Sequence, residues 1–264
     1  MINLVTNFNS NYNEDPILYL GFDKHLESGK DCYLFVGGHP HDSIFHHQDL
    51  PKYFFSTEEQ TWPQDTTDKY VPYVEKIFTI CPSSVTGRAK REDAFFPIDG
   101  DKIPPQTEKE FDVVYAGFAG APHVSEIISV LPDYSYRFIS FGQINGMVTD
   151  VNVSYLEKLN VLSKCKISLI HNLAGNGTPQ LKSRPFEAAA ARCLILCKKD
   201  EWNIIETWFE EGKDFLYFTD VNDLREKINH ILANYSEYQF MIENAYNKVV
   251  NNYTTKHFVQ KYLS

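Results

Sequence analysis

Two cations and a carboxylate stand close together before a run of alanines in the C-terminal half of the chain. Lys182 and Arg184 precede Pro185, and Glu187 follows. Proline suits the first turn of a helix, so the spacing predicts a helix that begins at Pro185 with both cations beside it. Unpaired backbone N–H groups and two cations favour a phosphate, and a carboxylate can accept two ribose hydroxyls. The stretch therefore predicts a site for a nucleotide diphosphate. An alanine-rich core helix with surface cations is the structural alternative.

Loops that follow strands supply more candidates, because ligands of open parallel sheets bind beyond the carboxyl ends of the strands. Gly117 and Phe118 follow an expected strand at 112–116, where glycine lets the backbone approach a diphosphate. His171 and Asn172 follow another apolar strand, in a polar loop with glycines. A tight turn and a strand-end histidine are the plain structural alternatives. We interpret these residues, with Lys182 to Glu187, as the donor-binding set.

The N-terminal part offers a base and an acceptor site. A carboxylate or histidine can remove the proton from an attacking hydroxyl. The candidates for this base follow strands: Glu58, Glu59 and Asp42. The candidates for contacting an acceptor are His39, His41 and Trp62, whose indole could stack on a sugar face. Each of these side chains, taken alone, is equally typical of a solvated surface.

A metal site is not expected. The histidines near residue 40 lack a cysteine or carboxylate cluster at metal-ligand spacing. The pair Asp99 and Asp101 lies in an expected linker rather than after a strand. A departing diphosphate can be stabilised by protein cations instead of a metal, so we expect a metal-independent site that needs no cofactor.

Strands alternate with amphipathic helices over most of the chain, which predicts an α/β fold with parallel sheets. In the first part, strands are expected at 2–6, 32–36, 52–56 and 76–81, with a helix from Pro16 to a stop at Gly29 and another running through Arg91. A polar, proline-marked break at 98–110 predicts the boundary between two domains, 1–105 and 106–264. We expect two Rossmann-like domains facing one another across a cleft, with hinge motion near 100–110.

Composition narrows the class of protein. The 264 residues are 43% hydrophobic, which indicates an ordered globular chain. A net charge of −10 excludes broad nucleic-acid binding, which needs clustered cations. Five irregularly spaced cysteines indicate free thiols in a reducing compartment. The start lacks a charged leader, and no apolar run approaches the roughly 18 residues of a membrane span, so we expect a soluble cytoplasmic protein.

The run from Arg184 through Phe186-Glu187-Ala188 resembles the nucleotide-sugar-binding half of GT-B glycosyltransferases, in particular the group 1 and spore-maturation-type enzymes. The resemblance continues through 208–214, 217–220, 223–228 and 253–254 and covers residues 110–264 well, the N-terminal part only loosely. Two positions depart from the family pattern: Arg192 replaces a glycine, and Pro179 stands where many retaining members have a second glutamate.

The resemblance implies a hexosyl- or pentosyltransferase of glycan biosynthesis that moves a sugar from a nucleotide-diphosphate donor, UDP being favoured, to a glycan hydroxyl. It also implies that the last helix packs back onto the first domain. Because the second glutamate is missing and acidic candidates exist in the first domain, inversion is favoured. A binding protein of the same fold without catalysis is the alternative, and an epimerase or hydrolase is a third hypothesis. Fold alone does not fix chemistry.

Overall fold

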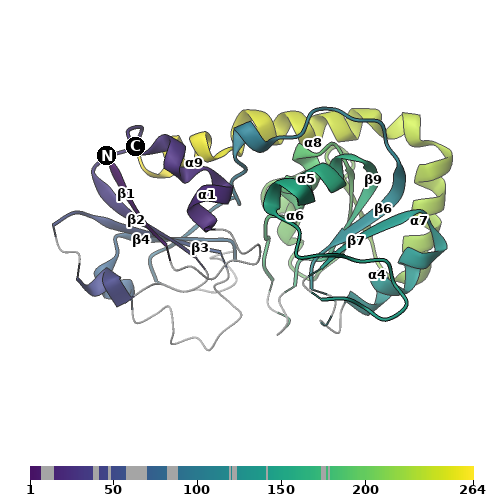
Figure 1. The fold of residues 1–264 in the computed structure, drawn as a ribbon, viewed down its shortest axis with the longest axis horizontal. Helices are drawn as coiled ribbons and strands as arrows, with labels where there is room; N and C mark the ends of the chain where they lie inside the picture. Colours follow the sequence, from purple (N-terminus) through teal and green to yellow (C-terminus); the bar gives the residue numbers. More distant parts are fainter. Residues whose placement is uncertain are drawn as a thin grey trace.

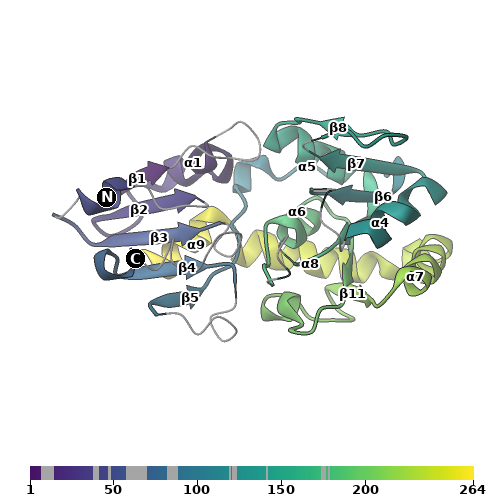
Figure 2. The same ribbon diagram turned by 90° about the horizontal axis from the view of Figure 1, so that it is seen from below.

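The computed structural model describes residues 1–6, 15–37, 42–46, 49–57, 70–81, 89–118, 120, 124–140, 142–173, 177 and 179–264. Two α/β units lie side by side, and the yellow C-terminal helices run along both (Figure 1). Each unit is built on its own parallel sheet, as Figure 2 shows from a second side. The α/β class with two facing Rossmann-like units is therefore confirmed.

The N-terminal sheet has its strands in chain order and parallel, and these strands are β1 (Ile2–Thr6), β2 (Cys32–Gly37), β3 (Lys52–Ser56), β4 (Lys76–Thr79) and β5 (Arg91–Asp93). Its central strands are almost continuously apolar, because helices or loops cover both faces of such a sheet. Phe54 and Ile77 face one cluster, and the neighbouring Phe55 and Phe78 face the other. The expected strands in this half are confirmed.

One expected helix in this half ends earlier than predicted, and the other falls mostly on residues 82–88, which lie outside the described residues. Helix α1 (Pro16–Leu20) stops at Gly21, well before Gly29, and a 3-10 turn follows. Gly21 has a φ of 74°, and a Cβ there would lie 2.5 Å from the Asp99 side chain, so the chain turns where only glycine fits. Arg91 begins β5 rather than continuing a helix, directly after Lys90 in a left-handed conformation.

The C-terminal sheet has the order β11-β10-β9-β6-β7-β8, all parallel. Its strands are β6 (Phe111–Ala116), β7 (Tyr136–Ser140), β8 (Asp150–Val151), β9 (Cys165–Ile170), β10 (Leu194–Lys198) and β11 (Phe215–Phe218). The helices are α4 (Ser125–Val130), α5 (Tyr155–Ser163), α6 (Arg184–Ala190), α7 (Val221–Ala233), α8 (Gln239–Asn252) and α9 (Thr255–Tyr262). The short 3-10 turns are η1 (Phe22–His25), η2 (Asp42–Phe45), η3 (Val71–Tyr73), η4 (Gly100–Lys102), η6 (Leu131–Asp133), η7 (Ile204–Thr207) and η8 (Tyr235–Tyr238).

Alternate residues of β6 belong to different layers. Val113 and Tyr115 join a cluster with α4 and α7, whereas Val114 and Ala116 join a cluster that includes α5 and α6. A strand presents successive side chains to opposite faces, so β6 anchors both helix layers. Helix α5 begins at a capping box in which Ser154 and Glu157 satisfy each other's backbone N–H groups.

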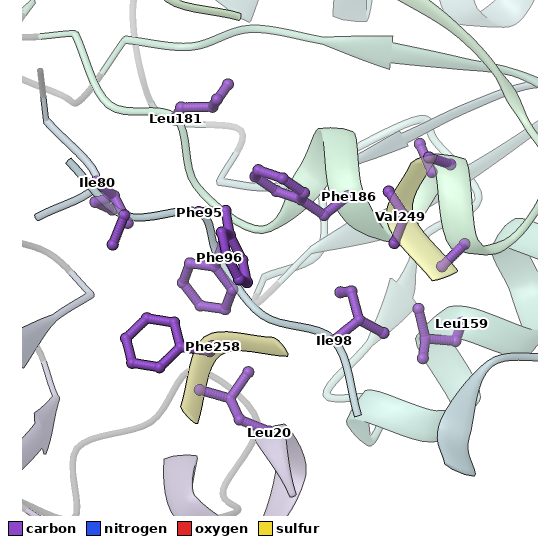
Figure 3. Close-up of a cluster of buried hydrophobic side chains, with 14 of the residues drawn as sticks. Leu20, Ile80, Phe95, Phe96, Ile98, Leu159, Leu181, Phe186, Val249 and Phe258 are labelled. Atoms are coloured by element: carbon purple, nitrogen blue, oxygen red, sulfur yellow. The ribbon is translucent and has the colours of Figure 1, made fainter. Parts of the chain in front are cut away.

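The chain crosses between the units twice, and the two crossings bind each other. Ile98 donates a backbone hydrogen bond to Tyr253 O (3.1 Å) and accepts one from Thr255 N–H (3.0 Å). Helix α9 then packs on the N-terminal unit, where Phe258 contacts the rings of Phe22 and Phe55. Figure 3 shows Phe258 of α9, Ile98 and Phe186 of α6 among the side chains of one buried hydrophobic cluster, which draws residues from both units. No helix in the described part of the chain is long and apolar enough to span a membrane.

Candidate active site

The carboxyl ends of β6 and β9 lie side by side where the C-terminal sheet changes direction. From β6 the chain continues to β7 and β8, and from β9 it continues to β10 and β11 on the other side. Loops that leave such a pair diverge and open a crevice, the usual ligand site of this architecture. Gly117 and Phe118 leave β6 here, and His171 and Asn172 leave β9. The two predicted loops therefore share one edge of the sheet.

Arg184 reaches this edge from the start of α6. Its Nη1 lies 3.4 Å from the hydroxyl of Tyr115 on β6. A Cβ added to Gly117 would lie 3.0 Å from the same Nη1 and 2.8 Å from the Tyr115 oxygen, so the glycine leaves room for the guanidinium. Arginine forms strong paired hydrogen bonds with phosphate, and a glycine lets backbone N–H groups come equally close. The arrangement can therefore hold a diphosphate.

The other residues of the 182–187 stretch lie partly at this edge of the sheet and partly in the hydrophobic core. Lys182 is half-buried. Pro185 and Phe186 are buried, and the Phe186 ring lies 5.2 Å from Phe209 and 5.5 Å from Tyr253, centroid to centroid. These two residues pack α6 against the core and do not face the crevice. Helix α6 is a short element that begins at Arg184.

Glu187 is fully buried and forms an ion pair with Lys158 of α5. The Lys158 ammonium donates to Glu187 Oε2, whereas Glu187 Oε1 has no hydrogen-bond partner. Burial lowers the pKa of Lys158, and the carboxylate opposes that effect. An ionised oxygen without a partner in the core is unfavourable. In this pair, Oε2 of Glu187 is occupied by Lys158, whereas Oε1 can still accept a hydrogen bond.

Lys158 is absent from the residues predicted from the sequence, although its spacing carries a signal. Tyr155, Leu159 and Leu162 mark the buried face of α5, and residue 158 falls on that same face, three positions after Tyr155. A lysine at such a position needs a buried anion. Matching it to Glu187 required knowledge that α5 and α6 lie in the same layer.

A cavity of about 200 Å³ adjoins the end of β9 on the side of β10. His171 and Asn172 line it, together with residues outside the predicted set, among them Glu126, Lys198 and Asp200. Lys198 Nζ donates to Glu126 Oε2 (2.5 Å) and to the Thr219 carbonyl (2.6 Å). For Lys198 and Asp200 the available signal was a charge at the end of an apolar strand, because such residues lie at the same sheet edge as the other candidates; Glu126 belongs to α4 and carries no such signal.

The carboxyl edge of the N-terminal sheet faces this crevice. Leu181 N–H donates to the Ile80 carbonyl (3.0 Å), so the loop before α6 meets the end of β4. Among the predicted residues of this unit, the structure describes Asp42, which is exposed and accepts a hydrogen bond from the Tyr70 hydroxyl (3.0 Å). The remaining candidates lie outside the described residues: Glu58, Glu59, His39, His41 and Trp62.

The aspartates of the linker form ion pairs within the N-terminal unit. Lys24 donates to Asp99 (2.8 Å) and to Asp101 (2.7 Å), next to the tight turn at Gly21. Within the described ranges, no three histidine, cysteine, aspartate or glutamate side chains gather closely enough to hold a metal ion.

Solved structures show the same architecture. HepE from Anabaena, in complex with UDP and glucose, has a TM-score of 0.64 at 11% identity over 97% of this chain and 82% of its own. The pneumococcal O-GlcNAc transferase GtfA, in complex with UDP and GlcNAc, has a TM-score of 0.61 at 12% identity over 92% of this chain. Sucrose-phosphate synthase from Thermosynechococcus elongatus has a TM-score of 0.62 at 9% identity over 91% of this chain and 74% of its own.

The chain spans only 57% of GtfA and 56% of TarM, another structural neighbour, so these likenesses establish the fold. No protein of curated function matches the sequence. A family model described as glycosyl transferase-like matches residues 125–264, just over half of the chain, a range that includes His171, Asn172 and Arg184 of the crevice but begins after Gly117. The chain therefore belongs to the glycosyl transferase-like family and has the two-unit GT-B fold.

Proposed function

We propose that the protein transfers a sugar from a nucleoside-diphosphate donor, a UDP-sugar, to a hydroxyl of a glycan acceptor. The observation that carries the proposal is the position of Arg184 beside Gly117, at the crevice between β6 and β9. Family membership supports glycosyl transfer. Among the neighbours of the same fold, HepE and GtfA are solved with UDP, which supports UDP as the first nucleotide to test.

The donor diphosphate would lie against Arg184 and the backbone after Gly117, with Lys182 adding charge. Two positive side chains can stabilise the negative charge that develops on a departing diphosphate, the task that a metal ion performs elsewhere. We therefore propose transfer without a metal ion or a cofactor. A chelator should leave nucleotide binding unchanged.

The ribose would bind at Glu187. Its Oε1 has no partner, and a buried polar atom in this state gains a full hydrogen bond when a ligand hydroxyl reaches it. Because the side chain is fully buried, the donor must displace the groups that cover it. Lys158 holds the other oxygen of the carboxylate in place during that exchange.

Activation of the acceptor falls to a carboxylate of the N-terminal unit. Inversion requires a base that takes the proton of the attacking hydroxyl as the bond to the sugar forms. Asp42, oriented by the Tyr70 hydroxyl, is one candidate, and Glu58 and Glu59 are the others. Closure of the units would exclude the water that competes with the acceptor.

Binding is tested by thermal stabilisation with a panel of nucleotides and nucleotide sugars in the presence of chelator, because a ligand selective for the folded state raises its stability. We expect UDP to stabilise the wild type and Arg184→Ala to abolish the effect. The matched control is Arg225→Ala, which removes a partly exposed arginine paired with Asp133 on the far helix layer. No stabilisation by any nucleotide, or stabilisation that needs added metal, would contradict the proposal.

Turnover is tested separately. Release of UDP from a UDP-sugar in the presence of a glycan library should occur with the wild type and fall at least a hundredfold when the base is replaced, with Asp42→Asn, Glu58→Gln and Glu59→Gln compared singly. Nucleotide binding should survive in all three variants. Binding without turnover in the wild type would instead identify a non-catalytic binding protein.

A further inference from the structure

We infer that the cavity beside β10 receives the sugar of the donor and that it selects an uncharged sugar, with Asp200 as the acceptor for a sugar hydroxyl. The inference rests on the proposed function and names the class of sugar. It depends on three properties of the cavity: its position, its unused acceptor and its balanced charge.

The position follows from the strand ends. The cavity shares His171 and Asn172 with the crevice between β6 and β9, where the diphosphate is proposed to lie. Its other wall is the start of the loop after β10. At about 200 Å³ it is smaller than the roughly 300–1,000 Å³ pockets that enclose drug-sized ligands, and it suits a single sugar ring. A sugar bonded to the diphosphate would thus enter from the crevice side.

Asp200 supplies the unused acceptor. Its Oδ1 accepts hydrogen bonds from the backbone N–H groups of Trp202 (3.0 Å) and Ile204 (3.2 Å), which fixes the carboxylate at the turn after β10. Its Oδ2 is buried and has no partner. Burial raises the pKa of this carboxyl against the lowering effect of the backbone hydrogen bonds. A hydroxyl group of a ligand could donate a hydrogen bond to Oδ2 without bringing a further charge into the cavity.

The charges that line the cavity balance. Lys198 is paired with Glu126, and Lys199, whose ammonium lies 5.3 Å from the centre of the Tyr217 ring, stands beside Asp200 in the sequence and in the lining. His171 accepts the Leu173 N–H at Nδ1 (3.0 Å), so its neutral form carries the proton on Nε2.

A uronate or phosphate would meet two carboxylates there as well as two ammonium groups, and an amino sugar would meet the same four, so a charged sugar gains no net attraction to offset the repulsion by its like charges. Like charges that face each other in a partly buried site cost several kilocalories per mole. The side chains that line the cavity therefore favour a neutral sugar ring with several hydroxyl groups.

Asp200→Asn is the decisive variant, because its side-chain oxygen can still cap the turn while an amide nitrogen replaces Oδ2. We expect UDP to bind both proteins equally by calorimetry, and UDP-glucose to bind the variant roughly ten- to a hundredfold more weakly, the value of a hydrogen bond to a charged group. UDP-glucuronate should bind the wild type no better than UDP alone. Asp133→Asn, an exposed aspartate of η6, is the matched control.

Glu126→Gln tests the charge argument independently of Asp200. It removes one negative charge and leaves Lys198 bound to the Thr219 carbonyl, so UDP-glucuronate should gain affinity relative to UDP-glucose. Equal UDP-glucose affinity in the wild type and in Asp200→Asn, or a wild-type preference for UDP-glucuronate, would overturn the inference while leaving nucleotide binding intact. Failure of the wild type to bind UDP or any other nucleotide of the panel would overturn the proposed function, and this inference with it.

Discussion

Replacing Lys158 by methionine should destabilise the protein severely, because it leaves the carboxyl group of Glu187 without its counter-ion in the core. The carboxylate is fully buried, Lys158 holds its Oε2, and its Oε1 already lacks a partner. Removing one member of a buried ion pair costs about 3–5 kcal/mol. At about 2–4 °C per kcal/mol for a chain of this size, the melting temperature should fall by roughly 6–20 °C.

The double variant Lys158→Met with Glu187→Leu should recover most of that loss. Apolar residues of similar volume in place of a buried pair are commonly neutral or stabilising by about 1–4 kcal/mol. Calorimetry on the wild type, both single variants and the double variant gives the coupling between the two residues. A drop below about 1 kcal/mol in Lys158→Met would refute the reasoning.

The same set of variants separates a structural role of Glu187 from a functional one. If Glu187 binds the ribose, the double variant should be folded and thermally stable yet lose stabilisation by UDP. If UDP stabilises the double variant as much as the wild type, Glu187 contributes packing and charge compensation alone, and the ribose assignment is wrong. Arg184→Ala serves as the reference for complete loss of nucleotide binding.

Three further results are expected. Gly117→Ala should weaken UDP binding by about 1.5–3 kcal/mol, because its Cβ would press on the Arg184 guanidinium, whereas Gly142→Ala, with nothing within 4 Å, should not change the Kd. Lys109→Met should cost about 1–3 kcal/mol in urea unfolding, because Lys109 Nζ donates to carbonyls at the ends of α5 and α6. Burial lowers the pKa of Lys109 below 10.5, so on raising the pH the folded state loses this proton before the unfolded state does. The free energy of unfolding of the wild type, relative to that of Lys109→Met, should therefore rise with pH up to about 10.5. A relative stability that falls with pH would contradict this. Phe258→Ala should cost about 3–5 kcal/mol and loosen both units together in hydrogen exchange, whereas loosening of α9 alone would argue against a continuous core.

The sheets could be predicted from the sequence because buried parallel strands are local runs of apolar residues. The run at 32–36 and the run at 167–170 each identify a strand without reference to the rest of the chain. The sequence alone does not decide between Gly21 and Gly29 as the end of α1, because either glycine can cap a helix; the folded structure adds Asp99, whose side chain occupies the space beside Gly21.

In the candidate site, too, some residues could be predicted from the local sequence and others could not. Gly117 and Arg184 could each be predicted as site residues, the first from its place after a strand and the second from its place before a helix. Their contact could not be predicted, because it depends on which strands are neighbours in the sheet. Lys158 and Asp200 were missed because their significance lies in what surrounds them: one is paired in the core, and the other has an oxygen without a partner. Burial and pairing are tertiary properties, so a sequence pattern can suggest such residues only when a charge interrupts an apolar face.

The return of α9 to the N-terminal unit also sets an order of events during synthesis. Thr255 donates from its hydroxyl to the Leu20 carbonyl across 235 positions of the chain. At about 5–20 residues per second, a ribosome needs roughly 10–50 s to make that span. During this time the face of the first sheet that receives Phe258 stays uncovered. The first unit to be synthesised is therefore the last to be completed, and chaperone binding should concentrate on that exposed aromatic face in nascent chains.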